Sequence, residues 1–131
     1  MLFDASALLN IIGEKGEDSI EFLKSGYITD LTFYEVGNAM WKSVYRELLT
    51  ANDAEVILRA FNQLSTTMKV IPYNRSELPD ILKISLNEYL TFYDASYIHN
   101  AAKNDLSLVT DDKKLKKAAN KYLKVLESEE I

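Results

Sequence analysis

With 131 residues, of which 47% are hydrophobic and 27% charged, the chain has the size and composition of one soluble domain with a substantial core. It contains no cysteine, which excludes disulfides, zinc–thiolate sites and cysteine nucleophiles and fits a reducing cytoplasm. The net charge of −5 argues against a large phosphate-binding surface, although lysines are concentrated between residues 103 and 124. No apolar run is long enough to cross a membrane and no basic segment opens the chain, so we expect a cytoplasmic protein without a signal peptide.

The hydrophobic pattern alternates between short apolar runs and longer amphipathic segments. Strands are predicted at residues 1–3, 26–29, 69–73, 107–110 and 124–126. Helices are predicted at residues 5–12, 18–24, 31–49, 50–67, 76–90, 94–103 and 111–122, and residues 127–130 are expected to form a frayed acidic tail. Short strands separated by helices favour an α/β fold with a parallel sheet, and right-handed crossovers place helices on both of its faces.

Helical periodicity also predicts which apolar side chains face the core. The candidates are Leu9, Ile20, Leu23, Phe33, Val36, Met40, Val44, Leu48, Val56, Leu58, Phe61 and Leu64.

Aspartates follow two of the predicted strands. Asp4 comes directly after the first strand, and Asp111 and Asp112 follow the strand at residues 107–110. Binding sites in open parallel sheets form beyond the carboxyl ends of the strands. These acids therefore meet at one edge of the sheet if the two strands are neighbours.

Two further acids stand in predicted helices, Glu35 in the long third helix and Asp94 at the start of the sixth. Carboxylates that lie close together repel, and without a metal at least one would keep its proton. A hard divalent cation relieves that repulsion and prefers oxygen ligands. Such an ion makes a bound water more acidic and stabilises charge on phosphorus, so the acids favour a site for phosphodiester hydrolysis.

Each acid also has a purely structural explanation. Asp4 can simply end a strand, while Asp94, Asp111 and Asp112 stand where an acid caps a helix and favours its dipole.

Glu35 is harder to explain as a cap, because it lies inside its helix. At 100° per residue it shares one polar stripe with Asn38, Lys42 and Arg46, which by itself would indicate a solvated face.

Taken together and in this order, the patterns at residues 2–6, 34–38, 93–97 and 108–112 resemble the PIN domain, over nearly the whole chain. The likeness is closest to small single-domain members typified by VapC toxins. It implies that residues 1–131 form a single PIN-like three-layer α/β domain, in which helices flank a central parallel sheet of four to five short strands. It also implies an endoribonuclease that uses Mg²⁺ or Mn²⁺ to cut single-stranded or loop RNA.

The resemblance assigns the catalytic and metal-binding acids to Asp4, Glu35, Asp94 and Asp112. Asp112 is chosen over Asp111 because it ends a Thr-x-Asp pattern, which leaves Asp111 as the expected helix cap.

Other polar residues near the acids have expected supporting roles. Ser6 and Thr110 carry hydroxyls that either orient a carboxylate or a metal-bound water, or cap a helix. Asn38 is expected either to support the acids or to contact the substrate. Lys42 and Arg46 are expected to contact backbone phosphates of the substrate.

The expected partners are an RNA substrate, a second copy of the chain and an antitoxin protein. The homodimer is suggested by the resemblance and by Trp41 and Tyr45, which lie on the flank of the long helix. His99, the only histidine, is expected at the surface or partly buried and not in catalysis, because it lies on a different helix face from Asp94.

Two other functions compete with this interpretation. A receiver-like signalling domain also binds Mg²⁺ at a parallel sheet, but it needs a phosphoacceptor aspartate at the end of a middle strand, and no predicted middle strand ends in aspartate. A catalytically inactive PIN-like binding module would be expected to lack one of the four acids, and none is missing.

Overall fold

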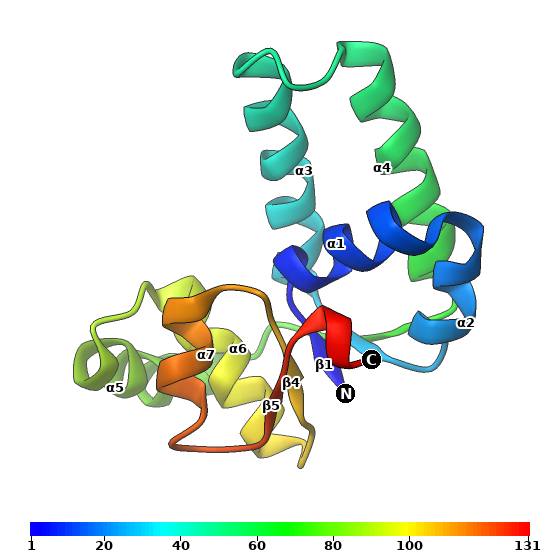
Figure 1. The fold of residues 1–131 in the computed structure, drawn as a ribbon. Helices are drawn as coiled ribbons and strands as arrows, with labels where there is room; N and C mark the ends of the chain where they lie inside the picture. Colours follow the sequence, from blue (N-terminus) through cyan, green and yellow to red (C-terminus); the bar gives the residue numbers. More distant parts are fainter.

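Five short parallel strands form the centre of the computed structural model, which describes all 131 residues (Figure 1). They are β1 (Leu2–Phe3), β2 (Tyr27–Thr29), β3 (Lys69–Ile71), β4 (Leu108–Val109) and β5 (Val125–Leu126). Their order in the sheet is β3-β2-β1-β4-β5, and every neighbouring pair is parallel. The predicted parallel sheet of four to five short strands is confirmed.

Seven α-helices cover the sheet. They are α1 (Ala5–Lys15), α2 (Ser19–Leu23), α3 (Asp30–Tyr45), α4 (Ala51–Ser65), α5 (Leu78–Glu88), α6 (Phe92–Lys103) and α7 (Lys113–Ala119). Three short 3-10 helices complete the chain: η1 (Gly16–Asp18), η2 (Arg75–Glu77) and η3 (Ser128–Glu130). In Figure 1, α1 to α4 lie on one side of the sheet and α5 to α7 on the other, and α3 and α4 extend together well beyond it. No helix is both long enough and apolar enough to traverse a bilayer.

Alternation along the strands produces the three layers. Successive side chains of a strand point to opposite faces, and Leu2 and Phe3 of β1 accordingly enter two different cores. Phe3 joins Val109 in a cluster with α1 to α4, whereas Leu2 joins Leu108 in a second cluster with α6 and α7. Both strands are buried on both faces, which explains why they read as short apolar runs with no polar alternation.

The neighbouring strands β1 and β4 place the first and last acids at the same edge. Phe3 is in register with Val109, and the amide of Asp4 donates to the Val109 carbonyl at 3.1 Å. Because β1 and β4 end at this paired position, Asp4 and Asp112 follow the carboxyl ends of two neighbouring strands. The expected shared edge of the sheet is confirmed.

Helix α3 ends earlier than predicted, at Tyr45 and not near residue 49. Glu47 adopts a left-handed backbone (φ 60°), and the amide of Leu48 reaches back to the Ser43 carbonyl at 2.8 Å. These are features of a helix terminated by a left-handed residue. Leu48 consequently leaves the predicted apolar face and is 71% exposed.

The prediction of a frayed tail is wrong. Residues 128–130 form η3, the side chain of Ser128 is buried, and its amide donates to Asp111 at 2.8 Å. Ile131 packs against the core on the α1 side of the sheet. These contacts hold the last residues in place although their acidic composition suggests a solvated end.

Candidate active site

A cleft of about 700 Å³ opens at the carboxyl ends of β1 and β4 and contains the four predicted acids. Asp4 directly follows β1, Glu35 lies in α3, Asp94 lies in α6, and Asp112 directly precedes α7. These positions are far apart in the sequence, and only the fold brings them together. Ser6, Asn38 and Lys42 also line the cleft.

Asp4 is the most deeply buried of the four acids, with 4% of its surface exposed. One carboxylate oxygen accepts hydrogen bonds from the Ser6 hydroxyl at 2.7 Å and from the Ala7 amide at 2.9 Å, which caps α1. The other oxygen accepts a hydrogen bond from the buried Thr110 hydroxyl. Burial raises the pKa of Asp4 and outweighs these hydrogen bonds, which act in the opposite direction. The site therefore orients the carboxylate firmly while leaving it costly to ionise.

Glu35 extends from the second turn of α3 into the cleft and carries an unpartnered oxygen. Its Oε1 atom is buried and has no hydrogen-bond partner. Burial raises the pKa of Glu35; the Tyr97 hydroxyl opposes this effect, and the charges of Asp94 and Asp4 add to it. A buried carboxylate oxygen without a donor is unfavourable unless a cation or water satisfies it.

Asp94 lies in the first turn of α6, but it does not cap that helix. Thr91 is the cap, and its hydroxyl accepts the Asp94 amide at 3.1 Å. The carboxylate of Asp94 remains free to face the cleft. Burial raises its pKa, and the negative charge of Asp112 raises it further.

The predicted division of roles between Asp111 and Asp112 is wrong in one respect, since Asp112 caps α7. Its Oδ1 atom accepts the Leu115 amide at 2.9 Å, and its own amide donates to the Thr110 hydroxyl at 3.1 Å. The helix begins at Lys113, so the residue immediately before it, Asp112, takes the capping position. Capping uses one oxygen of Asp112, and the residue still lines the cleft.

Asp111 has a different, structural role. Its carboxylate accepts hydrogen bonds from the Asn10 side chain at 2.6 Å and from the Ser128 amide at 2.8 Å. Although burial raises its pKa, these hydrogen bonds together with the Lys116 charge lower it overall. Asp111 thus links α1 to the C-terminal segment and does not line the cleft.

The supporting residues divide between the cleft and its surroundings. Thr110 is fully buried behind Asp4. Arg46, in contrast, is the exposed residue that ends α3 and does not line the cleft, so it does not share the position of Lys42. His99 lies elsewhere on α6, largely buried and 3.1 Å from Glu77, and it is not among the residues that line the cleft.

Three tyrosines that the sequence analysis did not single out also line the cleft: Tyr34, Tyr93 and Tyr97. Tyr34 and Tyr93 each immediately precede an acid of the cleft and are 80% and 60% exposed. The sequence could have indicated this position, because a residue that directly precedes an acid pointing into the cleft lies at the rim of that cleft.

The donor set of the cleft fits a hard divalent cation. All four acids offer oxygen, and the orphaned Oε1 of Glu35 lacks the partner that a cation or its water would supply. No three of the acids lie close enough together to form a closed metal site by themselves. An ion held here would complete its coordination with water, as Mg²⁺ does where few carboxylates bind it.

A parallel sheet between helices, with four acids in a cleft at its edge, defines a class of α/β proteins with a candidate metal site. Comparison with known families agrees with this class. A family model described as "PIN domain" matches residues 1–121, and the chain belongs to this family. Membership rules out the receiver-like alternative.

Individual relatives come from Pyrobaculum aerophilum. The chain is 34% identical to Exonuclease VapC9 over 114 residues, which is 87% of this chain and 81% of that protein. It is 30% identical to Ribonuclease VapC3 over 120 residues, or 88% of this chain and 91% of the relative. The solved crystal structure of PAE2754 superposes with a TM-score of 0.80 at 30% identity, covering 98% of this chain and 83% of the other.

Proposed function

We propose that this chain is a metal-dependent endoribonuclease that hydrolyses phosphodiester bonds in single-stranded or loop RNA. The observation that carries the proposal is the convergence of Asp4, Glu35, Asp94 and Asp112 on one cleft at the sheet edge. The names of two relatives, an exonuclease and a ribonuclease, support a nuclease. The alternative of an inactive PIN-like module has no support from the acids, since all four line the cleft.

The four acids would hold Mg²⁺ or Mn²⁺ in part through water, because no three of them lie close enough together to form a closed metal site. Such an ion, when bound, stabilises negative charge on the phosphoryl group and makes a coordinated water more acidic. Ser6 and Thr110 fix the orientation of Asp4 by donating hydrogen bonds to its two oxygens. Lys42, at the exposed side of the cleft, offers a positive charge to a backbone phosphate, and Asn38 offers an uncharged polar group beside it.

Circular single-stranded RNA is the substrate that tests this function, because only an internal cut can linearise it. The purified chain should cut the circle with Mg²⁺ or Mn²⁺, stop with EDTA and recover when metal is restored. Asp94→Asn should lower the rate sharply. Asp80→Asn provides a matched control, since Asp80 also lies in the first turn of a helix, α5, but outside the cleft.

Circular dichroism of each variant separates lost chemistry from lost folding. Cleavage that persists in EDTA, or full activity in Asp94→Asn, contradicts the proposal. Degradation of linear RNA from an end, with the circle intact, would instead assign an exonuclease.

Metal binding has its own test, which does not depend on finding the right RNA. Titration calorimetry with Mn²⁺ should detect binding to the parent chain and none to an Asp4→Asn, Asp94→Asn double variant. Unchanged binding in the double variant would show that the metal lies elsewhere.

Partners follow from the same proposal. The VapC relatives support a toxin–antitoxin role, with an antitoxin protein as partner. We expect the chain to act on RNA in the cytoplasm. We also expect a homodimer, because Trp41 and Tyr45 stack on each other on the outside of α3, 61% and 75% exposed. Light scattering at micromolar concentration tests the dimer, and a monomer mass would reject it.

A further inference from the structure

Two more hollows, which together we call the side groove, adjoin the acid-lined cleft. The first, of about 410 Å³, shares Leu31, Tyr34 and Tyr93 with the cleft. The second, of about 800 Å³, lies between η2 and the C-terminal half of α6 and shares Tyr73 and Asn74, among others, with the first. Neighbouring hollows therefore share part of their lining and lie in a row, and this row offers a path along the surface to a strand seated at the acids.

Exposed aromatic rings border this path. Tyr34, Tyr93 and Tyr73 are 80%, 60% and 58% exposed, and each lines more than one of the hollows. The backbone under Tyr73 is fixed, because its amide donates to Asp30 at the start of α3 at 2.8 Å. Rings held at the rim of a nuclease cleft and not packed in the core are suited to stack on unpaired bases.

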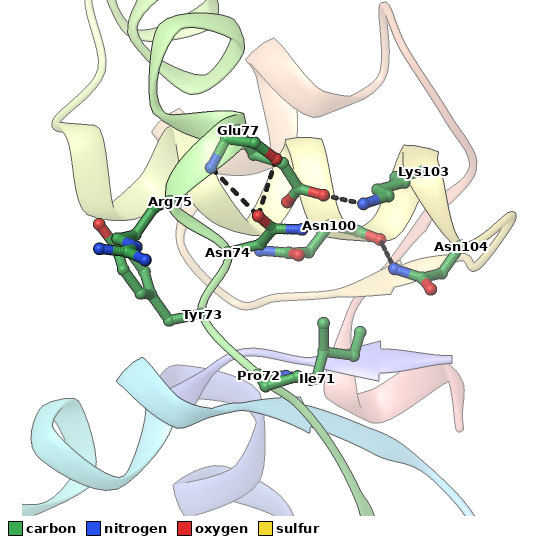
Figure 2. A pocket seen from close by; sticks show the side chains of 10 residues that line it. Ile71, Pro72, Tyr73, Asn74, Arg75, Glu77, Asn100, Lys103 and Asn104 are labelled. Carbon is green, nitrogen blue, oxygen red and sulfur yellow. Dashed lines mark hydrogen bonds and ion pairs between the residues drawn. The ribbon is translucent and has the colours of Figure 1, made fainter.

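Polar groups in the far hollow complement the rings. Figure 2 shows Asn74, Glu77, Asn100 and Lys103 gathered at its centre. The Asn74 side-chain oxygen is occupied by Ser76, which leaves its amide NH₂ free to donate to a base edge. The Asn100 NH₂ group donates to the Ser96 carbonyl at 2.8 Å, which leaves its oxygen free to accept.

The charge of the far hollow also suits a polyanion better than the net charge of −5 suggests. The one acid in it, Glu77, is nearly buried and is paired with both Lys103 and His99. Arg75 is exposed on the same hollow and forms no ion pair. The path thus leads from the acids to Arg75, whose charge no acid neutralises. Lys42 lies at the other end of the path, in the acid-lined cleft.

We infer that the side groove binds the unpaired bases of single-stranded nucleic acid next to the bond that is cut, by stacking on Tyr34, Tyr93 and Tyr73. This inference rests on the proposed nuclease function and adds to it the part of the substrate that the chain recognises. The amides of Asn74 and Asn100 contact base edges, and Arg75 contacts a phosphate at the far end. A duplex is excluded, because its bases are stacked on each other and cannot lie on the rings.

Binding is measured by fluorescence anisotropy in an Asp94→Asn background, which prevents turnover. The probe is a labelled single-stranded RNA of about ten nucleotides, within the ~4–16 nucleotides that single-strand grooves cover. A second probe keeps the same backbone but has abasic sites on one flank. Tyr93→Ala and Tyr73→Ala should each weaken binding of the full RNA about tenfold, the loss expected for one stacked base, and leave binding of the abasic strand nearly unchanged.

Conservative variants and a remote tyrosine provide the controls. Tyr93→Phe and Tyr73→Phe keep the ring and should bind like the parent. Tyr89→Asn removes an 85% exposed tyrosine outside the groove, at a left-handed position (φ 55°) that asparagine tolerates, and should also bind like the parent. Circular dichroism checks folding, and Tyr34→Ala repeats the test on a second helix.

The outcomes separate this inference from the nuclease proposal. Equal binding by the alanine variants and the parent, or an equal loss on the abasic strand, overturns base stacking in the groove. Base-dependent binding that needs the tyrosines supports it even if the parent chain fails to cut circular RNA, a result that would count against the nuclease alone. Equal affinity for a duplex of the same sequence would also overturn it.

Discussion

Thr110 donates its buried hydroxyl to Asp4 across the boundary between β4 and β1, joining two residues 106 positions apart in the chain. The same hydroxyl oxygen accepts the amide of Asp112 at 3.1 Å. One side chain therefore sets the position of the acid after the first strand and of the acid that begins α7. The relationship explains why a threonine lies at the end of β4, where an apolar residue would suit the surrounding core equally well.

Replacing Thr110 with valine should lower nuclease activity about 10- to 100-fold, the usual cost of losing a group that orients metal ligands. Valine has nearly the same shape as threonine but cannot donate to Asp4 or accept from Asp112. Thr110→Ser keeps the hydroxyl and should retain most of the activity. Cleavage rates at saturating Mn²⁺, together with the Mn²⁺ affinity, check this expectation. If the valine variant is as active as the serine variant, the hydroxyl has no part in organising the site.

The raised pKa values of Asp4, Glu35 and Asp94 predict a stability that depends on pH and metal. Burial raises the pKa of Glu35, so the folded state holds this proton more tightly than the unfolded chain. Without metal, the contribution of Glu35 to the free energy of unfolding is therefore greatest below the ordinary carboxyl pKa. This contribution falls as the pH rises from there through the raised pKa. Divalent metal should stabilise the protein most above this range, where the acids are charged.

Glu35→Gln should therefore make the metal-free protein more stable at pH 7, raising its Tm by roughly 2–5 °C. A buried neutral amide costs less than a buried charge. The same variant should lose the increase in Tm that Mn²⁺ gives the parent. Thermal melts across pH 4–8, with and without Mn²⁺, measure both effects, and exposed Glu14→Gln is the control. A Tm below the parent at every pH would contradict the assignment of Glu35 as an unfavourably buried acid.

Replacing Gly26 or Gly13 with alanine should change the free energy of unfolding in opposite directions. A Cβ atom at Gly26 would lie 2.7 Å from the Phe3 ring and 2.9 Å from the Leu23 carbonyl oxygen, and that backbone atom cannot move cheaply. Gly26→Ala should lower the free energy of unfolding by about 1–3 kcal/mol. Gly13, inside α1, has nothing within 4 Å of the same position, so Gly13→Ala should raise it by about 0.5–1 kcal/mol. Urea titrations of both variants test the pair, and similar changes in the two would refute the packing argument.

The acid-lined edge was predictable because it depends on local signals. An apolar run that ends in aspartate marks the end of a buried strand, and the parallel sheet then determines where that aspartate emerges. Asp4 and Asp112 follow this logic directly. Glu35 and Asp94 needed the family resemblance, since a polar helix stripe and an acid at a helix start each have an ordinary structural explanation.

Other features depended on contacts that no local pattern records. Ser128 is buried and its amide donates to Asp111, and neither residue signals the other in the sequence. Val56 has the helical spacing of a core residue yet is 58% exposed, and Leu48 is 71% exposed. Val56 lies in α4 near the end of the α3–α4 pair, which extends beyond the sheet and which nothing in the chain covers (Figure 1). Leu48 is exposed for a different reason, because α3 ends at Tyr45 and helical periodicity no longer applies to it.

The last prediction concerns Lys42 and Arg46. Helical periodicity puts both residues on one polar stripe, but only Lys42 lines the cleft in the structure. Lys42 lines the acid-lined cleft, one turn beyond Asn38, whereas Arg46 follows the end of α3 and lies outside it. A lysine that contacts phosphate releases a counterion on binding, so its loss weakens binding and reduces the dependence on salt. Lys42→Glu should reduce the affinity of Asp94→Asn protein for single-stranded RNA and lower the slope of log affinity against log salt by about one or more.

Arg46→Glu makes the same change of charge four residues away and should alter the slope much less. Anisotropy titrations between 50 mM and 200 mM salt resolve this difference, because about one phosphate contact changes the slope measurably over that range. A general electrostatic attraction would affect both variants equally, since each lowers the net charge by the same amount. Equal slopes for the two variants would therefore place the phosphate contact outside the cleft, and a larger effect at Arg46 would direct the RNA along the outer end of α3.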